Sequence, residues 1–334
     1  MSGPVVRIAL ASLGLALGWK ASARTPLQLA AYQGPDGAIT VQRGGDLVDP
    51  YFATLALLVA HRGGLAERPA ALAFIAWLLP QQGADGLFAR YCGQPGGTWS
   101  TCAPADADDA LLALWMALLE VESRAAPPPQ SWQTSLARSS AALAALRDPA
   151  SGVYRVAPGD PSALLMDNVE VETALRLMAQ ARVRRGELAA SAALRARADG
   201  LRRAMARAFP VGPDGLIRYR RPAEAGEAPR FYPDRVAHLY PWLHGMSTRL
   251  WPGRLSYRHW MEAYRDEWLG LAADPFPWGL VALVALGRGD AAAARAWCAR
   301  ARPLRDGPRW NVLEEVAFQR LAASARVEGA CSID

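Results

Sequence analysis

The stretch that decides the fold is ADGLFARYCGQPGGTWSTCAPADADDALLALW, residues 84–115. It begins with an Asp-Gly turn, continues through alternating polar and apolar residues, and ends in a helix whose start holds Asp106, Asp108 and Asp109. A tight turn followed by alternation predicts a short strand or hairpin. The helix beyond it is apolar on nearly every side, which is expected of a helix that other helices surround.

The same unit recurs along the chain. Turns within PDGAITVQ (35–42), PASGVYRV (149–156) and PDGLIRYR (213–220) each precede an acidic residue and a mostly apolar helix. Amphipathic helices with arginine-rich faces lie between the apolar ones, which is a pattern of outer and inner helices. Helix hairpins repeated at roughly 50 residues predict an all-α fold, an (α/α)6 toroid with short β-hairpins at its rim. We expect a single domain over residues 24–334.

The inner helices of such a ring run in the same direction, so their N-termini collect at one end. That end would gather Asp49, Asp106, Asp108, Asp167, Asp234 and Asp274. Capping of a helix is the plainer explanation for any one of them, and Asp109 is most simply explained in that way. Neighbouring aromatic residues favour a carbohydrate groove, because rings stack on sugars while carboxylates bind hydroxyls and move protons.

The order of these motifs resembles glycoside hydrolase family 8. The resemblance rests on YQGPDGAITVQRGGDLVDPYFATLALLVA (32–60), AFIAWLLPQQGADGLFARY (73–91) and PADADDALLALW (104–115). It implies an (α/α)6 barrel, with Asp49 as the catalytic acid, Asp106 as a carboxylate of the cleavage subsite, and Asp234 in YPDRV as the base. The chain departs from the family pattern at three of these places. Asp49 stands where the family has Glu, Ala105 replaces a hydroxyl residue, and Pro233 is inserted before Asp234.

The predicted function is that of an exported glycoside hydrolase acting on a bacterial polysaccharide, for example a β-1,4-glucan. Glycoside hydrolysis needs two carboxyl groups, and a gap of roughly 6.5–9.5 Å between them leaves room for a water and inverts the anomeric centre. Asp167 is a candidate for the second carboxylate. The residues predicted to bind substrate are Asp108, Tyr91, Trp99, Asp167, Tyr232, Arg235, Trp242 and Trp278.

Two alternatives remain open. A non-catalytic glycan-binding or scaffold subunit of an envelope polysaccharide secretion system would explain the missing Glu at position 49. A uronate lyase or epimerase on the same fold would use Arg235 and the net charge of +6 for an acidic substrate. No metal is predicted, because the four histidines have no ligand spacing. No nucleic-acid partner or cofactor is predicted, because the sequence has no nucleic-acid signature and no Gly-rich phosphate loop. His238 and Asp234 are four residues apart, which places them on one helix face.

The N-terminus has the pattern of a secretory signal peptide. Arg7 precedes an apolar run over residues 8–19, and Ala21-Ser22-Ala23 offers a small-residue cleavage site, so residues 1–23 would be removed. The mature protein is expected in the periplasm or secreted, as a monomer. An oxidising compartment makes an even number of cysteines indicate disulfides, and we expect the pairs Cys92–Cys102 and Cys298–Cys331.

Overall fold

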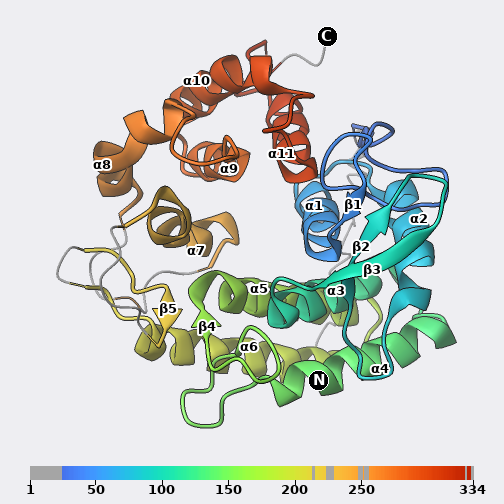
Figure 1. The fold of residues 1–334 in the computed structure, drawn as a ribbon. Helices are drawn as coiled ribbons and strands as arrows, with labels where there is room; N and C mark the ends of the chain where they lie inside the picture. Colours follow the sequence, from blue (N-terminus) through green and yellow to red (C-terminus); the bar gives the residue numbers. More distant parts are fainter. Residues whose placement is uncertain are drawn as a thin grey trace, which may run out of the picture.

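Inner helices form a closed ring in the computed structural model, which describes residues 25–212, 215–222, 229–246, 251, 256–327 and 329–331 (Figure 1). Each inner helix contacts the next one along the chain, and α11 also contacts α1. Their bounds are α1 (Pro50–Arg62), α3 (Asp108–Glu122), α5 (Leu165–Arg184), α7 (Tyr240–Leu243), α9 (Gly279–Gly287) and α11 (Val312–Ala322).

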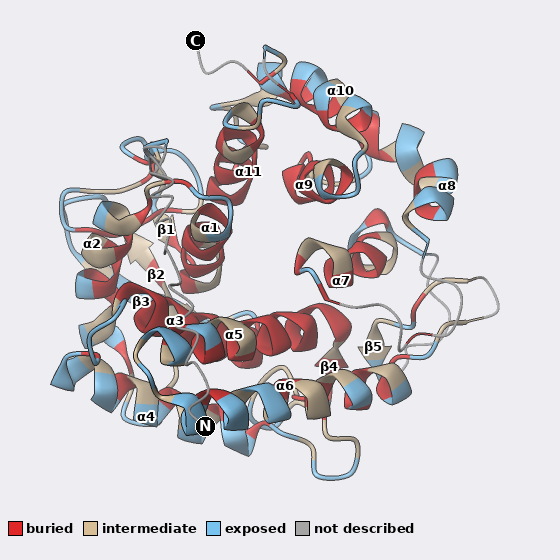
Figure 2. Ribbon diagram, turned by 180° about the vertical axis from the view of Figure 1, so that it is seen from behind, coloured by how far each residue is buried: buried red, intermediate tan, exposed pale blue. Residues whose placement is uncertain are grey.

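Outer helices cover this ring. They are α2 (Arg68–Leu78), α4 (Gln130–Ala145), α6 (Leu188–Ala208), α8 (Tyr257–Leu269) and α10 (Ala291–Ala301). α2 packs against α1 and α3, α4 against α3, α6 against α5, and α10 against α8, α9 and α11. Figure 2 shows the inner ring almost wholly buried and the outer helices exposed on one face. This is the predicted arrangement, although the described residues supply five outer helices for six inner ones.

The difference in burial follows from composition. Every residue of α3 is buried, and apolar residues occupy all sides of this helix after its acidic first turn. α6 instead carries arginines on one side and buries only small or apolar residues such as Ala198, Leu201 and Met205 on the other. An apolar helix is stable only when neighbours surround it, whereas an amphipathic helix needs a single covered face.

The fourth inner helix, α7, is preceded by short helical turns. A single π-helical turn, η2 (Phe231–Arg235), and a 3-10 turn, η3 (Val236–Leu239), lead directly into α7. Two further 3-10 turns, η1 (Leu79–Gln81) and η5 (Arg302–Leu304), extend the ends of α2 and α10.

Small antiparallel sheets lie at the rim, as predicted. β1 (Leu47–Val48), β2 (Ala89–Gly93) and β3 (Trp99–Pro104) form one sheet in that order, and β4 (Ala163–Leu164) pairs with β5 (Arg220–Arg221) in another. The recurring turns place a glycine at φ between +78° and +96°, a conformation that favours glycine, at Gly37, Gly86, Gly152 and Gly215. A Cβ on Gly86 would also lie 2.7 Å from the carbonyl oxygen of Arg138, so this turn packs directly on the backbone of α4.

Hydrogen bonds join the two ends of the described chain and close the ring. The side chain of Gln319 in α11 accepts a hydrogen bond from the backbone N–H of Gln28 at 2.9 Å and donates one to its carbonyl at 2.7 Å. The backbone N–H of Val312 donates to the carbonyl of Val41 at 2.9 Å. Residues that precede α1 thus hold the start of the last inner helix.

Both predicted disulfides are present. Cys92–Cys102 links β2 to β3 with the Cα atoms 5.7 Å apart, and Cys298–Cys331 ties α10 to the C-terminal segment with the Cα atoms 5.2 Å apart. The predicted signal peptide, residues 1–23, lies outside the described residues. In the part of the chain that is described, no helix combines the length and the apolar character needed to cross a membrane.

Candidate active site

The N-terminal ends of the inner helices surround a pocket with a volume of about 270 Å³. Its aromatic lining consists of Tyr51, Phe52, Tyr232, Tyr240, Phe276 and Trp278. Its carboxyl groups are those of Asp106, Asp274 and Glu314. No lysine, arginine or histidine is among the described residues that line this pocket. Acidic and aromatic groups therefore share one concave site at the end of the ring where the sequence predicts them.

Tyr232 and Trp278 form an aromatic pair on one side of the pocket. Their ring centroids are 4.8 Å apart with an angle of 31° between the planes, and Tyr232 is 39% exposed. The indole Nε1 of Trp278 is buried and has no hydrogen-bond partner among the described residues. An exposed ring beside an unused N–H donor is suited to a sugar, which offers both an apolar face and hydroxyl acceptors.

Glu314 holds Trp278 in a conformation that is rare for a residue other than glycine. Trp278 has φ +59°, and its backbone N–H donates to Glu314 Oε1 at 3.0 Å while that of Gly279 donates to Oε2 at 2.6 Å. Asn311 caps α11 and accepts from the N–H of Glu314, which fixes this residue in the first turn. Backbone held in a sparsely populated conformation is typical of functional sites.

Burial acts strongly on Glu314. It raises the pKa of Glu314 to about 8, although the N–H groups of Gly279 and Trp278 act to lower this pKa, and the charge of Asp274 adds to the rise. Gly279 is required at its position because a Cβ there would lie 2.8 Å from Glu314 Oε2. The loop before α9 and the first turn of α11 therefore form one unit around this carboxyl group.

Two carboxyl groups, Asp109 on α3 and Asp167 on α5, are buried beside the pocket. Asp109 is fully buried, Asp167 is 5% exposed, and each has one carboxyl oxygen with no partner in the described structure. Burial raises the pKa of Asp167 to about 7, and the nearby charge of Asp106 contributes to the rise. Burial followed by the charge of Asp167 raises the pKa of Asp109 well above its ordinary value. Asp106, in contrast, has a side chain that is 67% exposed.

Glu170 lies beneath the tyrosines of the pocket. The hydroxyl of Tyr51 donates to Glu170 Oε1 at 2.9 Å, and the other oxygen of this fully buried carboxyl has no partner among the described residues. His244 Nε2 is 3.9 Å from Glu170 Oε1, which is too far for a hydrogen bond. Burial raises the pKa of Glu170 and lowers that of His244 far from their ordinary values. Burial therefore favours the uncharged form of both groups.

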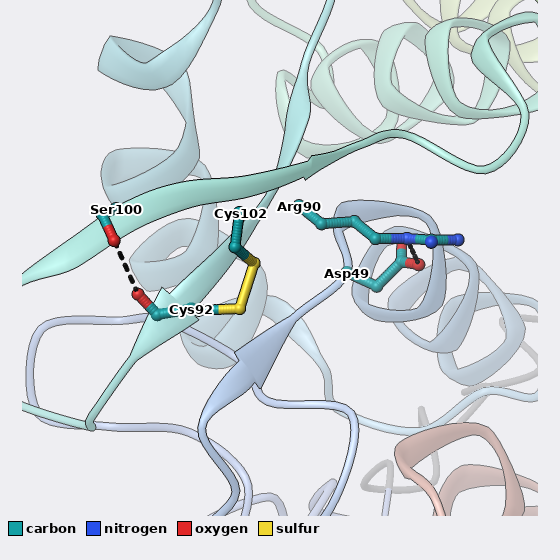
Figure 3. The surroundings of a disulfide bond; sticks show 5 residues. All are labelled: Asp49, Arg90, Cys92, Ser100 and Cys102. Carbon is teal, nitrogen blue, oxygen red and sulfur yellow. Dashed lines mark hydrogen bonds and ion pairs between the residues drawn. A yellow bond between two sulfur atoms is a disulfide. The ribbon is translucent and has the colours of Figure 1, made fainter.

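Asp49, predicted as the catalytic acid, is a buried anchor in the structure. Its Oδ1 accepts from the backbone N–H of Tyr51 at 3.0 Å and caps α1, and its Oδ2 accepts from Arg90 Nε at 2.8 Å (Figure 3). Only 3% of the residue is exposed, and it is not among the pocket-lining residues. Burial raises the pKa of Asp49, although Arg90 and the N–H of Tyr51 act to lower it. With both oxygens occupied, Asp49 lacks the access to substrate that an acid needs.

Asp234, predicted as the base, also lies outside the pocket lining. Its Oδ2 accepts the backbone N–H of Arg230 at 2.9 Å. The next residue, Arg235, pairs with Glu267 and lies 5.0 Å from the ring centroid of Tyr264, so it is held in a local cluster. His238 is buried and packs edge-on against Trp242 at 5.9 Å. The structure therefore does not bring Asp49 and Asp234 together across a groove.

Other residues predicted to bind substrate also lie outside the pocket lining. Tyr91 and Trp99 pack edge-on against Trp77, with centroids 5.4 Å and 5.9 Å away. Trp242 lies within 6.0 Å of the Arg288 guanidinium. Asp108 is 8% exposed, and burial, followed by the charge of Asp85, raises its pKa to about 6. Of the predicted set, Asp106, Tyr232 and Trp278 line the pocket, and Asp167 lies close enough to Asp106 for their charges to interact.

Asp109 corrects another prediction. It does not cap α3, because the N-cap residue is Ala107 and no side chain bonds there; its Oδ1 accepts only the adjacent N–H of Ala110. The sequence pattern offers Glu170 near the rim beside Asp167, whereas Glu314 was not predicted. The available signal was the same one that identified Asp106, namely carboxyl residues in the first turns of mostly apolar helices, including WNVLEEVAFQRLAA at 310–323.

Comparison with known proteins supports the fold. No protein-family model matches the chain, and no curated protein matches its sequence. Three solved structures match most of its length. An alpha-amylase from Clostridium perfringens is 11% identical, with 87% of this chain and 94% of that chain covered and a TM-score of 0.56. A glycosidase mutant in complex with glucose is 13% identical, with 88% of each chain covered and a TM-score of 0.54. A mutant of Rex8A from Paenibacillus barcinonensis complexed with xylose is 15% identical, with 90% of this chain and 88% of that chain covered and a TM-score of 0.52. The chain therefore has the helical toroid fold of these glycosidases.

Proposed function

We propose that this protein is a glycoside hydrolase that acts on a polysaccharide or oligosaccharide. The observation that carries the proposal is the pocket, where aromatic rings lie beside the carboxyl group of Asp106, together with the buried carboxyl group of Asp167, which is outside the pocket lining but close enough to interact with Asp106. Asp106 is exposed and ion-paired, whereas Asp167 is buried and has a raised pKa. When the environments of two titratable groups push their pKa values apart, the two groups are candidates for the acid and the base of a reaction.

We assign the two roles to neighbouring helix starts. Asp167, with a pKa of about 7, supplies a proton to the leaving oxygen near neutral pH. Asp106, the predicted subsite carboxylate, is exposed and paired with Arg90, and it activates water or stabilises the positive charge at the anomeric carbon. Glu314 has both oxygens bonded to backbone N–H groups, so it orients Trp278 and does not act on the sugar. These roles replace the predicted ones of Asp49 and Asp234.

The lining of the pocket favours a neutral sugar. A uronate would need a cationic partner, and none lines the pocket in the described part of the chain. This observation speaks against the lyase and epimerase alternatives. The motif order of family 8 and the likeness to solved glycosidases support a glucan-type substrate and inversion at the anomeric carbon. Export through signal peptide 1–23, as a monomeric domain over residues 24–334, is part of the same proposal, and two disulfides support it.

A second candidate is a glycan-binding subunit of an envelope secretion system without hydrolytic activity. It is favoured by the positions of Asp49 and Asp234 away from the pocket, because two residues of the family pattern then have no contact with substrate.

Release of reducing sugar by the mature protein, measured across neutral and acidic polysaccharides, tests these functions. Hydrolysis of a neutral glucan that is abolished by Asp106→Asn and by Asp167→Asn supports the proposal. Asp199→Asn is the matched control, because Asp199 lies on outer helix α6 and pairs with Arg176. Binding of glucan without hydrolysis by the wild type would select the second candidate. Proton NMR of the first anomer released reports inversion or retention.

A further inference from the structure

Arg90, in β2, joins a buried carboxylate to the exposed carboxylate of the pocket. Its Nε donates to Asp49 Oδ2 at 2.8 Å, and its Nη2 lies 3.0 Å from Asp106 Oδ1. The carboxyl of Asp49 is 4% exposed and that of Asp106 is 67% exposed. One guanidinium thus connects the N-cap of α1 to the turn that precedes α3.

The Asp49 end of this bridge is rigid. The second oxygen of Asp49 is held by the backbone N–H of Tyr51, so the carboxylate has no freedom to rotate away. Burial acts to lower the pKa of Arg90, but the charges of Asp49 and Asp106 outweigh it and raise this pKa. An ion pair at the surface is usually weak because two flexible side chains must be ordered. Here Asp49 has already ordered Arg90, so the pairing with Asp106 avoids that entropy cost.

The backbone of Arg90 is fixed as well (Figure 3). Cys92, two residues further along β2, is bonded to Cys102 in β3. Arg90 pairs with Ala103, whereas Tyr91 pairs with Thr101, so the register shifts between these two residues. Such a bulge redirects side chains and is common beside active sites.

We propose that Arg90 is a positioning residue that holds Asp106 in place at the pocket, anchored by Asp49 and by the Cys92–Cys102 hairpin. This inference rests on the proposed hydrolase function and gives Asp49 a role that its capping position allows. Without Arg90, the exposed side chain of Asp106 is free to turn into solvent, and the error in its position reduces turnover.

The pH profile reports this displacement. Asp106 helps to raise the pKa of Asp167, so a displaced Asp106 lowers that pKa. The rate falls as the acid loses its proton, and the alkaline limb of the profile therefore moves to lower pH in the Arg90 variant. The other titratable groups that interact with Asp167 are Asp109, Glu170, Tyr51, Tyr232 and Tyr240, and they remain unchanged.

The test compares Arg90→Gln, Arg90→Lys and a control, Arg68→Gln. Arg68 pairs with the 3% exposed carboxyl of Glu122 at 2.9 Å, which resembles the Arg90–Asp49 pair but lies at the end of α3 away from Asp106. Arg90→Gln is expected to lower kcat/KM by about 10- to 100-fold and to shift the alkaline limb downward. Arg90→Lys restores part of the rate, and Arg68→Gln leaves activity per folded molecule unchanged. An Arg90→Gln enzyme within twofold of wild type, or one with an unmoved alkaline limb, overturns the proposal.

The disulfide provides an independent arm of the test. Replacing Cys92 and Cys102 together with serine is expected to lower kcat/KM in the same direction but by less than Arg90→Gln, because the Asp49 anchor remains. The matching Cys298→Ser and Cys331→Ser protein is the control, since this disulfide joins α10 to the C-terminal segment and involves neither β2 nor β3. Equal losses in both double variants would mean that the hairpin disulfide has no specific role in placing Arg90.

A wild-type protein that hydrolyses nothing would refute the proposed function while leaving Arg90 testable. Crystal structures of wild type and Arg90→Gln then decide the matter. A displaced Asp106 side chain in the variant supports the positioning role, and an Asp106 in the same place overturns it.

Discussion

Buried carboxyl groups near the pocket differ from those elsewhere in the same helices. In α3 and α5, the residues beside the pocket each have a carboxyl oxygen without a partner in the described structure: Asp109, Asp167 and Glu170. The residues away from it are bonded to arginines, namely Glu120 to Arg182 and Arg185, Glu122 to Arg68, and Glu172 to Arg176 and Arg202. The first set costs stability, whereas the second is compensated. A fold that pairs some buried carboxyls and leaves others unpaired indicates where chemistry takes place.

The largest effect is expected for Asp167→Asn. Loss of a general acid lowers kcat by about 10²- to 10⁴-fold, since the amide has no proton to give. The free energy of unfolding at pH 7 should not fall, because the change removes a buried ionisable group that has no cationic partner. Steady-state kinetics and urea unfolding measure the two quantities. Full activity in this variant would show that Asp167 has no role in catalysis, and the lack of a partner would then not distinguish catalytic carboxyl groups from the arginine-bonded ones.

Glu120→Gln tests the paired set. It leaves the buried side chain of Arg185 without a carboxylate from α3, and breaking a buried pair of this kind costs about 3–5 kcal/mol. The turnover of the remaining folded protein should equal that of wild type. Chemical unfolding, with activity normalised to the folded fraction, checks both expectations. A stable but inactive Glu120→Gln protein would reverse the roles assigned to the two sets.

Buried carboxyl groups at and beside the pocket also make stability depend on pH. The folded pKa values of Asp167 and Glu314, about 7 and about 8, lie above their ordinary values of 3.8 and 4.5. Between these values the folded state binds more protons than the unfolded state, so the free energy of unfolding falls as pH rises from about 4 to about 8. Thermal unfolding across this range measures the slope, and Asp167→Asn should reduce it. A stability that rises over the whole interval would contradict the ionisation states on which the comparison depends.

The smallest effect is expected for Trp278→Phe, which keeps an aromatic ring but removes the unpartnered indole N–H. Loss of one hydrogen bond to substrate should raise KM by about 3- to 10-fold with little change in kcat. Trp297→Phe is the control for aromatic size, because its indole N–H donates to the Pro277 carbonyl inside the core at 2.7 Å. An unchanged KM in Trp278→Phe would show that this N–H does not meet the sugar.

Local signals predicted much of the molecule. The alternation of Asp-Gly turns with apolar helices identified the ring and its acidic end, and cysteine spacing identified both disulfides. Asp106, Tyr232 and Trp278 line the pocket for the same reason, since the starts of the inner helices meet in one place, and their roles in binding and catalysis stay predictions.

Contacts between distant segments could not be predicted in this way. Tyr51 and Glu170, which share a hydrogen bond, are 119 residues apart. Asp49 and Asp106 both precede helices, and no local pattern shows that the carboxyl group of Asp106 faces solvent. Nor does it show that the oxygens of Asp49 accept hydrogen bonds from the N–H of Tyr51 and from Arg90. Two residues with the same local signal therefore have different surroundings, and only the packing of β2 against the helix starts separates them.

The bonds between Gln28 and Gln319 have a consequence for the order of folding. The contacts of α1 with α11 join segments at opposite ends of the described chain, so α1 lacks one of its two neighbours in the ring until residues 312–322 have been made. Contacts of such high sequence separation form late and slowly. The ring therefore closes only once α11 has been made, and the side of α1 that contacts α11 stays uncovered until then; a truncation before residue 312 would leave an open ring with that side exposed.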